Sequence, residues 1–544
     1  MTIKPPLTDL PIETANSGFY EGFNTIVTVG SKILVGLLIV WAAAFPQQAG
    51  DMLSAVNGYL LKSFGTWYIL VMAFYLLTCL ALAIWPSTGR IRLGAEGEKP
   101  EFSTFSWFSM MFGAGIGIGM LTYSTGEPIY HFSTNPEIIM GQMQAESADV
   151  VRSAFKWSFL HWGLTAWGCY ALTGLALAFF SYRRGLPLTI RSGLTPLFGS
   201  SLSGGLGHVI DIVAVIATVL GVAVTIGFGV SQFASGLHNI SGAGWLMAAD
   251  GSPSNAAMVV ALLLVMGLST LSALSGVGKG IKWLSNLNMG LTFFFLAFLL
   301  LFGSTAFALK ALFVGIGDYL LALPAMMFTV WQPDGTETGD ALAGWQGSWT
   351  IFYWAWWIAF APFVGLFLAR ISKGRSLREY VLGAMVVPSL MCFIWFAMAG
   401  GTAIDLELNG GAGGAILDAS LSSQLFVTVN QLLSPTLAVA MSALLVVLLL
   451  TYLVTSADSA VLIINTINAA GDETQKGRIH IVVWGVALTL VIAALLFAGG
   501  LSAIQTAMII GALPFSFVLA LMGVALIKAI IRDGMRERQG RAAS

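Results

Sequence analysis

Charged residues are scarce in this sequence, and cysteine is almost absent. Only 9% of the 544 residues are charged, and the 25 Lys and Arg nearly balance the 26 Asp and Glu. A net charge of −1 provides no basic footprint for nucleic acid, so we expect no nucleic-acid partner. Apolar stretches hold all three cysteines (Cys79, Cys169 and Cys392), and their spacing indicates neither a disulfide framework nor a metal site.

Long apolar runs make up most of the chain. Hydrophobic residues account for 57% of it and the mean hydropathy is +0.84, which is more apolar surface than a soluble protein of this length can bury. A bilayer core of about 30 Å needs about 20 apolar residues per helix. We therefore predict an all-α polytopic membrane protein with twelve transmembrane helices. The predicted spans lie near residues 25–46, 66–86, 104–125, 154–181, 206–238, 256–276, 286–313, 348–370, 380–401, 436–467, 479–499 and 505–530.

Basic residues are concentrated in the connections that follow the even-numbered spans. They are Arg90, Arg92, Lys99, Arg183, Arg184, Arg191, Lys279, Lys282, Arg370, Lys373, Arg375, Arg378, Lys476 and Arg478, with Arg532, Arg536, Arg538 and Arg541 in the tail. The positive-inside rule then places both termini in the cytoplasm. We expect a multi-pass protein of a bacterial-type inner membrane.

The chain divides into one membrane domain and two short ends. We assign residues 1–24 to a cytoplasmic N-terminal segment, 25–530 to a single membrane domain and 531–544 to a short cytoplasmic tail. Acids and prolines precede the first apolar run, so no cleavable signal peptide is expected. After the seventh span, residues near 314–328 predict an external amphipathic helix along the surface, followed by a polar loop. An unstructured loop throughout is an equally good interpretation.

Glycine recurs at every second position of the third span, in MFGAGIGIGMLTYSTGEP: Gly113, Gly115, Gly117 and Gly119. Each interior Gly weakens a helix by roughly 1 kcal/mol relative to Ala. Small residues can serve close helix packing, but a spacing of two distributes them around the helix and not along one face. The pattern favours an unwound stretch whose bare amides and carbonyls line a cavity, as in the discontinuous helices of secondary transporters.

The tenth span carries a polar cluster, in LTYLVTSADSAVL: Thr451, Thr455, Ser456, Asp458 and Ser459. Hydroxyls often bond back to their own helix, which explains some of these residues. An acid is different, since Asp at mid-span costs about 3 kcal/mol. Oxygen ligands beside a broken helix suit a hard cation such as sodium.

Of two further acids, Asp211 falls within the fifth predicted span and Glu127 lies directly after the third. No nucleophile–base pair or metal-ligand cluster accompanies them in the sequence, so an enzyme is disfavoured. No pore-lining ring motif supports a channel.

Two spans are rich in aromatic rings. These are Trp162, Trp167 and Tyr170 in FLHWGLTAWGCYAL, and Trp356, Trp357, Phe360 and Phe363 in YWAWWIAFAPF. At about 100° per residue the first three rings lie on one helix face. Packing within the bundle is one explanation for them, and a cage for an organic cation is the other. Each ring over a desolvated onium group contributes roughly 0.5–2 kcal/mol, with Trp best, and the density of indoles favours the cage.

Four elements in order resemble the betaine/choline/carnitine transporter family. The most specific is WTIFYWAWWIAFAPFVGLFLARISKGRSLREY, supported by GAGIGIGMLTYSTGEP, HWGLTAWGCYAL and TSADSA. The resemblance covers nearly all of the membrane part. It implies two inverted five-helix repeats, spans 3–7 and 8–12, behind two extra N-terminal helices. It also implies alternating access, a homotrimer in the lipid bilayer, and onium substrates such as glycine betaine, carnitine, choline and sulfonium analogues.

The same resemblance assigns site residues. The aromatic box falls on Trp162, Trp167, Tyr170 and Trp357, with Trp356 and Phe360 beside it and the amides of Gly115, Gly117 and Gly119 facing a substrate carboxylate. A sodium site falls on backbone groups of Gly113 and Ile116 and on Tyr452, Thr455 and Ser456. No cofactor other than sodium as the coupling ion is implied.

Three departures from the family pattern bear on function. WWIAFAP replaces WWISWSP, so Phe360 stands where the family has Trp, which suggests a less symmetric onium such as dimethylsulfoniopropionate. Thr218 and Phe363 match a second sodium site, but Val222 replaces its other threonine, so this site is expected to be weak or absent. The ends are short, and strong osmotic activation is not expected. We predict sodium symport of a small onium zwitterion, with a sodium-independent onium exchanger or choline/carnitine uptake as the alternatives.

Overall fold

The chain folds into a bundle of helices. The computed structural model describes residues 5–115, 117–275, 282–472, 474 and 477–543, and the side-chain surroundings of all of these except 112–115, 282 and 540–543. Across the described residues the extended structure consists of isolated bridges, such as Arg92 with Ser376. The predicted all-α polytopic class is confirmed.

The helices are as follows. The long ones are α1 (Thr25–Ala44), α2 (Pro46–Ile84), α9 (Gly205–Ser241), α10 (Asn255–Ser275), α11 (Lys282–Phe302), α12 (Thr305–Met326), α14 (Phe352–Ile371), α15 (Leu377–Leu408), α17 (Pro435–Asn468) and α18 (Arg478–Ala543). The shorter ones are α3 (Thr104–Gly115), α4 (Ile118–Ser133), α5 (Pro136–Ile139), α6 (Val151–Trp162), α7 (Leu164–Ala178), α8 (Thr195–Phe198), α13 (Glu337–Gln346) and α16 (Gln424–Leu432). A π-helical turn, η7 (Gly347–Ile351), leads into α14.

Eleven helical segments of the described chain are long and apolar enough to cross a membrane. One of them, α18, contains two spans, because Gly499 and Gly500 leave the helical conformation and Gly500 has a φ of +67°. The third span is missing from the eleven, because it is broken into α3 and α4, each too short to cross alone. All twelve predicted spans therefore correspond to helices, and α12 is an additional apolar helix between the seventh and eighth.

The connection between the seventh and eighth spans differs from the prediction. The seventh span was placed at 286–313, but α11 ends at Phe302, and α12 begins at Thr305 and not near 314. The polar segment predicted as a loop contains α13, whose N-cap Thr336 accepts from the Gly339 amide. Gly303 and Ser304 mark the first boundary but lie inside one long apolar run, and a capping residue inside a polar stretch marks the second.

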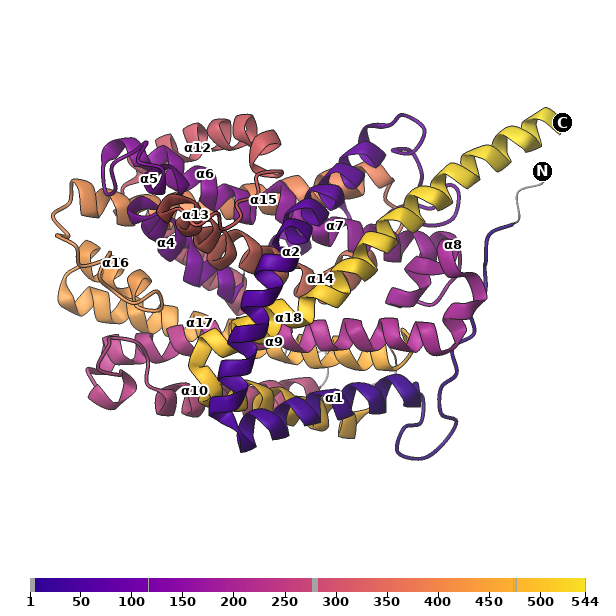
Figure 1. The fold of residues 1–544 in the computed structure, drawn as a ribbon, viewed down its shortest axis with the longest axis horizontal. Coiled ribbons are helices and arrows are strands. Elements are labelled where there is room, and N and C mark those ends of the chain that lie inside the picture. The colour runs from indigo at the N-terminus through magenta and orange to yellow at the C-terminus, as the bar shows by residue number, and fades with distance from the viewer. Residues whose placement is uncertain (1–4, 116, 276–281, 473, 475–476, 544) are drawn as a thin grey trace.

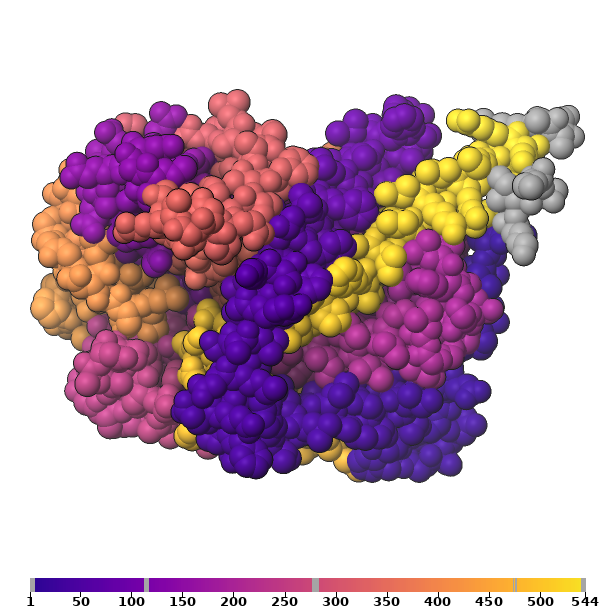
Figure 2. All heavy atoms as spheres, viewed as in Figure 1, coloured from indigo at the N-terminus to yellow at the C-terminus, as the bar shows by residue number. Residues whose placement is uncertain are grey.

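Both termini lie at one end of the bundle (Figure 1). The α1, α9 and α17 helices run roughly side by side along its long direction, and α5, α6, α12, α13 and α16 gather at the end away from the termini. In Figure 2, α2 crosses the visible face obliquely and meets the C-terminal half of α18, against which it packs. A shared end for the termini agrees with an even number of spans, whereas their cytoplasmic location stays a prediction.

Two intramembrane acids find partners close by. Asp211 on α9 pairs with Arg191, whose Nε lies 2.6 Å from Oδ2, and both side chains are fully buried. Asp458 on α17 accepts from the Ser272 hydroxyl at 2.6 Å and from Ser459 at 3.1 Å. These contacts compensate for the burial of the charges, so neither acid is left without polar contacts inside the bundle.

Candidate functional site

A cavity of about 820 Å³ lies among α3, α4, α6, α7, α9, α11, α14 and α17. Most of the residues proposed from the sequence line it together: Gly117, Gly119, Trp162, Trp167, Tyr170, Trp356, Trp357, Phe360, Phe363, Tyr452, Thr455 and Ser456. They come from α4, the consecutive α6 and α7, α14 and α17, four separate stretches of the chain, so the fold itself brings the predicted site together.

The break in the third span is narrower than predicted. Unwinding was expected from Gly115 to Gly119, but α3 ends with Gly115 and α4 begins at Ile118. Gly113 and Gly115 therefore belong to α3, and Ile116 lies outside the described residues. The N-cap of α4 is Gly117, which has no side chain to cap the first amides, and it lines the cavity with Ile118, Gly119 and Met120. A helix N-terminus with open amides is a binding site for anions.

Gly119 lies directly against two indoles. A Cβ atom at this position would stand 2.9 Å from Trp356 and 3.2 Å from Trp162. Real Cβ contacts are almost never this short, so only glycine allows the first turn of α4 to approach both rings.

The fourth span is also broken, which the sequence argument did not foresee. Regular helix from Trp162 to Tyr170 was assumed, but α6 ends at Trp162 and α7 begins at Leu164 after the non-helical Gly163. The amide freed at Leu164 donates to the Tyr319 hydroxyl of α12 at 2.9 Å. The three rings therefore share the cavity through a bend in the chain, and not through a single helix face.

The aromatic box is assembled around Trp357. Its ring centroid lies 5.7 Å from that of Trp162, 5.2 Å from Trp167 and 4.6 Å from Tyr170. The planes of Trp162 and Trp167 meet Trp357 at 79° and 68°, as adjacent walls of a box do. All four rings are at least 93% buried, and the remaining surface faces the cavity. Desolvated aromatic faces of this kind bind organic cations.

Trp356 and Phe360 extend the aromatic wall along α14. The Trp356 indole donates to the Thr225 hydroxyl of α9 at 3.1 Å, which fixes the ring. Phe360 meets Phe363 edge to face at 5.1 Å. The smaller ring at 360, where the family pattern has Trp, leaves α9 close enough that a Cβ on Gly221 would touch it at 3.2 Å.

The hydroxyls of α17 form the polar side of the cavity. Thr455 Oγ1 lies 2.9 Å from the Thr451 carbonyl oxygen and accepts from Asn288 Nδ2 at 3.2 Å. Asn288 is 95% buried, and its Oδ1 has no hydrogen-bond partner in the described part of the chain. Sequence reasoning missed Asn288, since an amide near the start of an apolar helix is not distinctive.

Of the two residues matched to the second sodium site, Thr218 and Phe363, one lines the cavity. Thr218 is fully buried and donates back to the Ala214 carbonyl at 2.8 Å. It is not among the described residues that line the cavity, although Phe363 is. Val222, one turn further along α9, offers no oxygen.

The cavity extends toward the end of the bundle that holds the termini. Ser109 in the middle of α3, Ser285 near the start of α11 and Phe367 near the end of α14 all line it. On the opposite side, Tyr123 packs against Phe228 at 5.3 Å and against Tyr353 at 5.4 Å between ring centroids. This aromatic layer covers the box on the side away from the termini.

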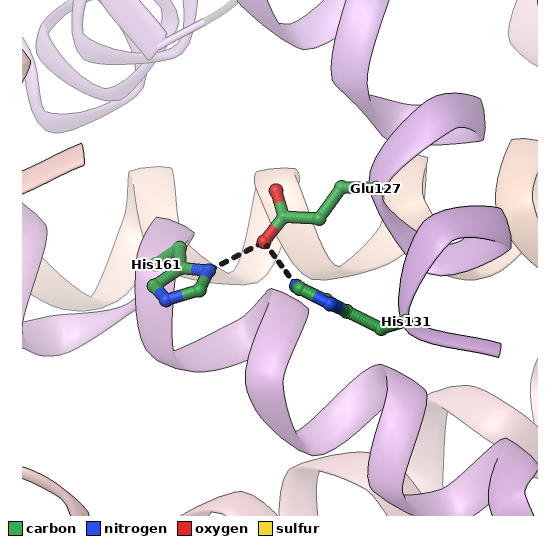
Figure 3. A group of neighbouring side chains, drawn as sticks. All are labelled: Glu127, His131 and His161. Carbon is green, nitrogen blue, oxygen red and sulfur yellow. Dashed lines mark hydrogen bonds and ion pairs between the residues drawn. The ribbon is translucent and has the colours of Figure 1, made fainter. Parts of the chain in front are cut away.

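A buried polar cluster behind the box was also missed. Glu127 of α4 contacts His131 on the same helix and His161 of α6, so two histidines accompany an acid for which the sequence suggested no partner (Figure 3). The spacing of Glu127 and His131, one helical turn, was the available signal. The contact with His161 depends on how α6 packs.

Comparison with known proteins decides the family. Residues 26–535 match the family described as the betaine/carnitine/choline family transporter, BCCT. The chain belongs to the BCCT family. It is therefore a multi-pass membrane transporter of the betaine and choline type.

Three relatives named as betaine or choline transporters resemble the chain over most of its length. It is 37% identical to a glycine betaine transporter of Bacillus subtilis (strain 168), over 91% of this chain and 92% of that one. It is 35% identical to a probable glycine betaine transporter of Desulfitobacterium hafniense (strain Y51), over 95% and 99%. A high-affinity choline transport protein of Escherichia coli (strain K12) is 35% identical over 96% of this chain and 74% of its own length.

The close approach at Gly119 leads to a first prediction for this BCCT protein. Gly119→Ala is expected to displace the Trp162 and Trp356 rings and to raise the Kd for an onium solute about tenfold, an overpacking effect of 1–3 kcal/mol. Binding of labelled glycine betaine measures it. Gly267→Ala on α10 is the matched control, because a Cβ there has no neighbour within 4 Å. Equal affinity in the two variants would contradict the assignment of Gly119 to the box.

Proposed function

We propose that this protein imports a small zwitterionic onium solute by sodium symport with alternating access across a bacterial-type inner membrane. The observation that carries the proposal is one cavity with an aromatic box, a free helix N-terminus and a set of hydroxyls, each suited to a different charge. Trp357 and its three neighbours would hold the methylated cation, since aromatic faces attract an onium group that cannot donate a hydrogen bond.

The carboxylate of the solute would bind at the start of α4. The open amides after Gly117 and the positive end of the helix dipole favour an anion there. A helix N-terminus stabilises a negative charge by about 0.3–1 kcal/mol in exposed settings and by more when partly buried. The proposed solute thus has its positive and negative ends held at different walls of one cavity.

Sodium would bind at α17, next to the broken third span. Tyr452, Thr455 and Ser456 carry hydroxyl groups and line the cavity, and the Tyr452 hydroxyl lies 2.7 Å from Thr292 Oγ1. The buried Oδ1 of Asn288, which has no hydrogen-bond partner in the described part of the chain, is a further oxygen nearby. Hard cations prefer oxygen ligands. Because Thr218 does not line the cavity and Val222 has no oxygen, we propose one sodium ion per solute.

Uptake by proteoliposomes tests the proposal. Glycine betaine, choline, carnitine and dimethylsulfoniopropionate are offered in turn, with sodium or potassium outside and with an inside-negative potential. Uptake of a zwitterion that requires sodium and rises with the potential supports symport. Uptake that requires an onium solute inside the liposomes and does not depend on sodium would indicate an exchanger. A preference for choline would indicate that the substrate is a cation and not a zwitterion. No uptake of any of the four would refute the proposal.

A further inference from the structure

The cluster behind the box is centred on one carboxylate. Glu127 Oε1 lies 2.6 Å from His161 Nδ1 and 3.2 Å from His131 Nε2, as the dashed lines in Figure 3 show. His161 Nε2 lies 3.0 Å from the hydroxyl of Thr350 in η7. The side chains of Glu127, His131 and His161 are all fully buried.

The other oxygen of Glu127 faces the box. Oε2 accepts from the Trp162 indole N–H at 2.8 Å and from the Tyr353 hydroxyl at 2.6 Å. The carboxylate thus has four donor groups around it, as many as an ionised carboxylate has acceptor sites. If the Glu127 carboxyl were protonated, its hydroxyl would point at a group that is itself a donor. The four donors therefore favour the ionised carboxylate.

The geometry argues against a metal ion among these three side chains. Two ligand atoms that each lie about 2.0–2.2 Å from one tetrahedral ion are separated by more than 3 Å. The separation of 2.6 Å between Oε1 and His161 Nδ1 is a hydrogen-bond distance. Glu127, His131 and His161 are hydrogen-bonded to one another, and an ion does not fit between Glu127 and His161 at this separation.

Trp162 connects the cluster to the cavity. Its ring lines the cavity and meets Trp357 at 79°, while its N–H is held by Glu127. An anion on the indole N–H fixes the plane of the ring and adds electron density to the face that an onium group would contact. Tyr353, the second donor, packs its ring 5.7 Å from Trp162 and 6.2 Å from Trp356.

We propose that Glu127 is a positioning residue of the onium box, and that uptake of a proton by Glu127, His131 and His161 weakens onium binding. The inference rests on the proposed function. Protonation removes an acceptor from Trp162 or cancels the negative charge beside the box, so affinity falls at acidic pH. Sodium binding at α17 is a separate site and is not required for this effect.

The neighbours of Glu127 add few other titratable groups. His131 and Tyr123 face it from α4, His161 from α6 and Tyr353 from α14. The α9 and α16 helices, which also pack against α4, present the neutral amides of Gln232 and Gln424, and α15 presents Gly400. Asp458 of α17 is a further acid near the cavity, where it accepts from Ser459, so the Glu127→Gln variant decides whether a pH effect belongs to the cluster.

Binding of labelled glycine betaine to the purified full chain, between pH 5.5 and 8, tests the inference. Its carboxylate stays ionised throughout this range. Glu127→Gln keeps the size of the side chain but removes the charge. Glu137→Gln is the matched control, because Glu137 also accepts an indole N–H, from Trp157 at 2.7 Å, and pairs with Lys156. Trp157 is not among the described residues that line the cavity.

The expected results separate the two variants. In the wild-type protein and in Glu137→Gln, the Kd should rise about tenfold from pH 7.5 to 5.5, which is about 1.4 kcal/mol. In Glu127→Gln it should already be about tenfold higher at pH 7.5 and should not change with pH. A wild-type Kd in Glu127→Gln, or an unchanged pH profile, overturns the inference.

A second variant tests the inference in case Glu127→Gln does not fold. Tyr353→Phe removes one donor from Oε2 and leaves the charge in place, so the Kd should rise about threefold with the wild-type pH profile retained. An unchanged Kd in Tyr353→Phe overturns the inference. If the wild-type protein binds none of the four onium solutes, the proposed function fails and this inference fails with it. Wild-type binding with unaffected variants refutes this inference alone.

Discussion

Replacing Trp357 by leucine is expected to raise the Kd for the onium solute about thirtyfold, whereas phenylalanine at the same position should raise it only about threefold. Trp357 is in ring contact with Trp162, Trp167 and Tyr170, so it completes the box. Leucine fills much of the same volume but has no π face, and the loss of about 2 kcal/mol of cation–π attraction corresponds to this factor. Phenylalanine keeps a ring, although a poorer one.

Equilibrium binding of labelled glycine betaine measures the effect, with thermal unfolding as a check on folding. The comparison at one position separates π attraction from simple hydrophobic filling. If the leucine and phenylalanine variants bind equally well, the rings do no more than pack the bundle. The onium head group would then bind elsewhere.

Thr455→Val removes one of the oxygens proposed to bind the ion. The sodium concentration for half-maximal uptake should therefore rise at least tenfold, which corresponds to a loss of about 1.4 kcal/mol or more in the free energy of sodium binding. The change keeps the shape of the side chain. Thr451→Val is the matched control one turn earlier on α17, where the hydroxyl donates to the Leu448 carbonyl at 2.9 Å and does not contribute to the main cavity. Uptake into proteoliposomes over a range of sodium concentrations measures both variants. An unchanged sodium response in Thr455→Val would remove this residue from the ion site.

The number of ions follows from the same measurement. Thr218→Val is expected to leave the sodium response unchanged, and the Hill coefficient should be near one, because Thr218 does not line the cavity and Val222, one turn further on, has no oxygen. One charge that crosses 100 mV supplies about 2.3 kcal/mol, or roughly fifty-fold accumulation. A coefficient near two would contradict the single-ion proposal.

The sequence predicted the spans well because hydrophobicity acts on each helix separately. It failed where the chain breaks inside an apolar stretch. Where Gly163 interrupts the fourth span, the freed amide of Leu164 donates to Tyr319, which lies 155 positions further along the chain than Leu164. A local pattern does not contain such a partner, whereas Gly303 and Ser304 do mark the join between α11 and α12.

The site shows the same division. Aromatic residues and hydroxyls stand out in an apolar sequence, so Trp357 and Thr455 could be proposed from it. Glu127 was visible as an acid, but its role depends on His161 and Tyr353, which belong to two other helices. Buried polar networks are assembled by tertiary packing, so their members are recognised only after the helices are placed.

The hydrogen bond from the Leu164 amide to the Tyr319 hydroxyl connects the start of α7 with α12. An amide left without an acceptor in an apolar interior costs several kcal/mol. Any rearrangement of α6 and α7 that keeps this hydrogen bond therefore carries α12 with them. Phe313 and Leu321 of α12 point outward, with 70% and 85% of their surface exposed. The helix that holds an amide beside the box thus also forms part of the apolar outer surface of the bundle.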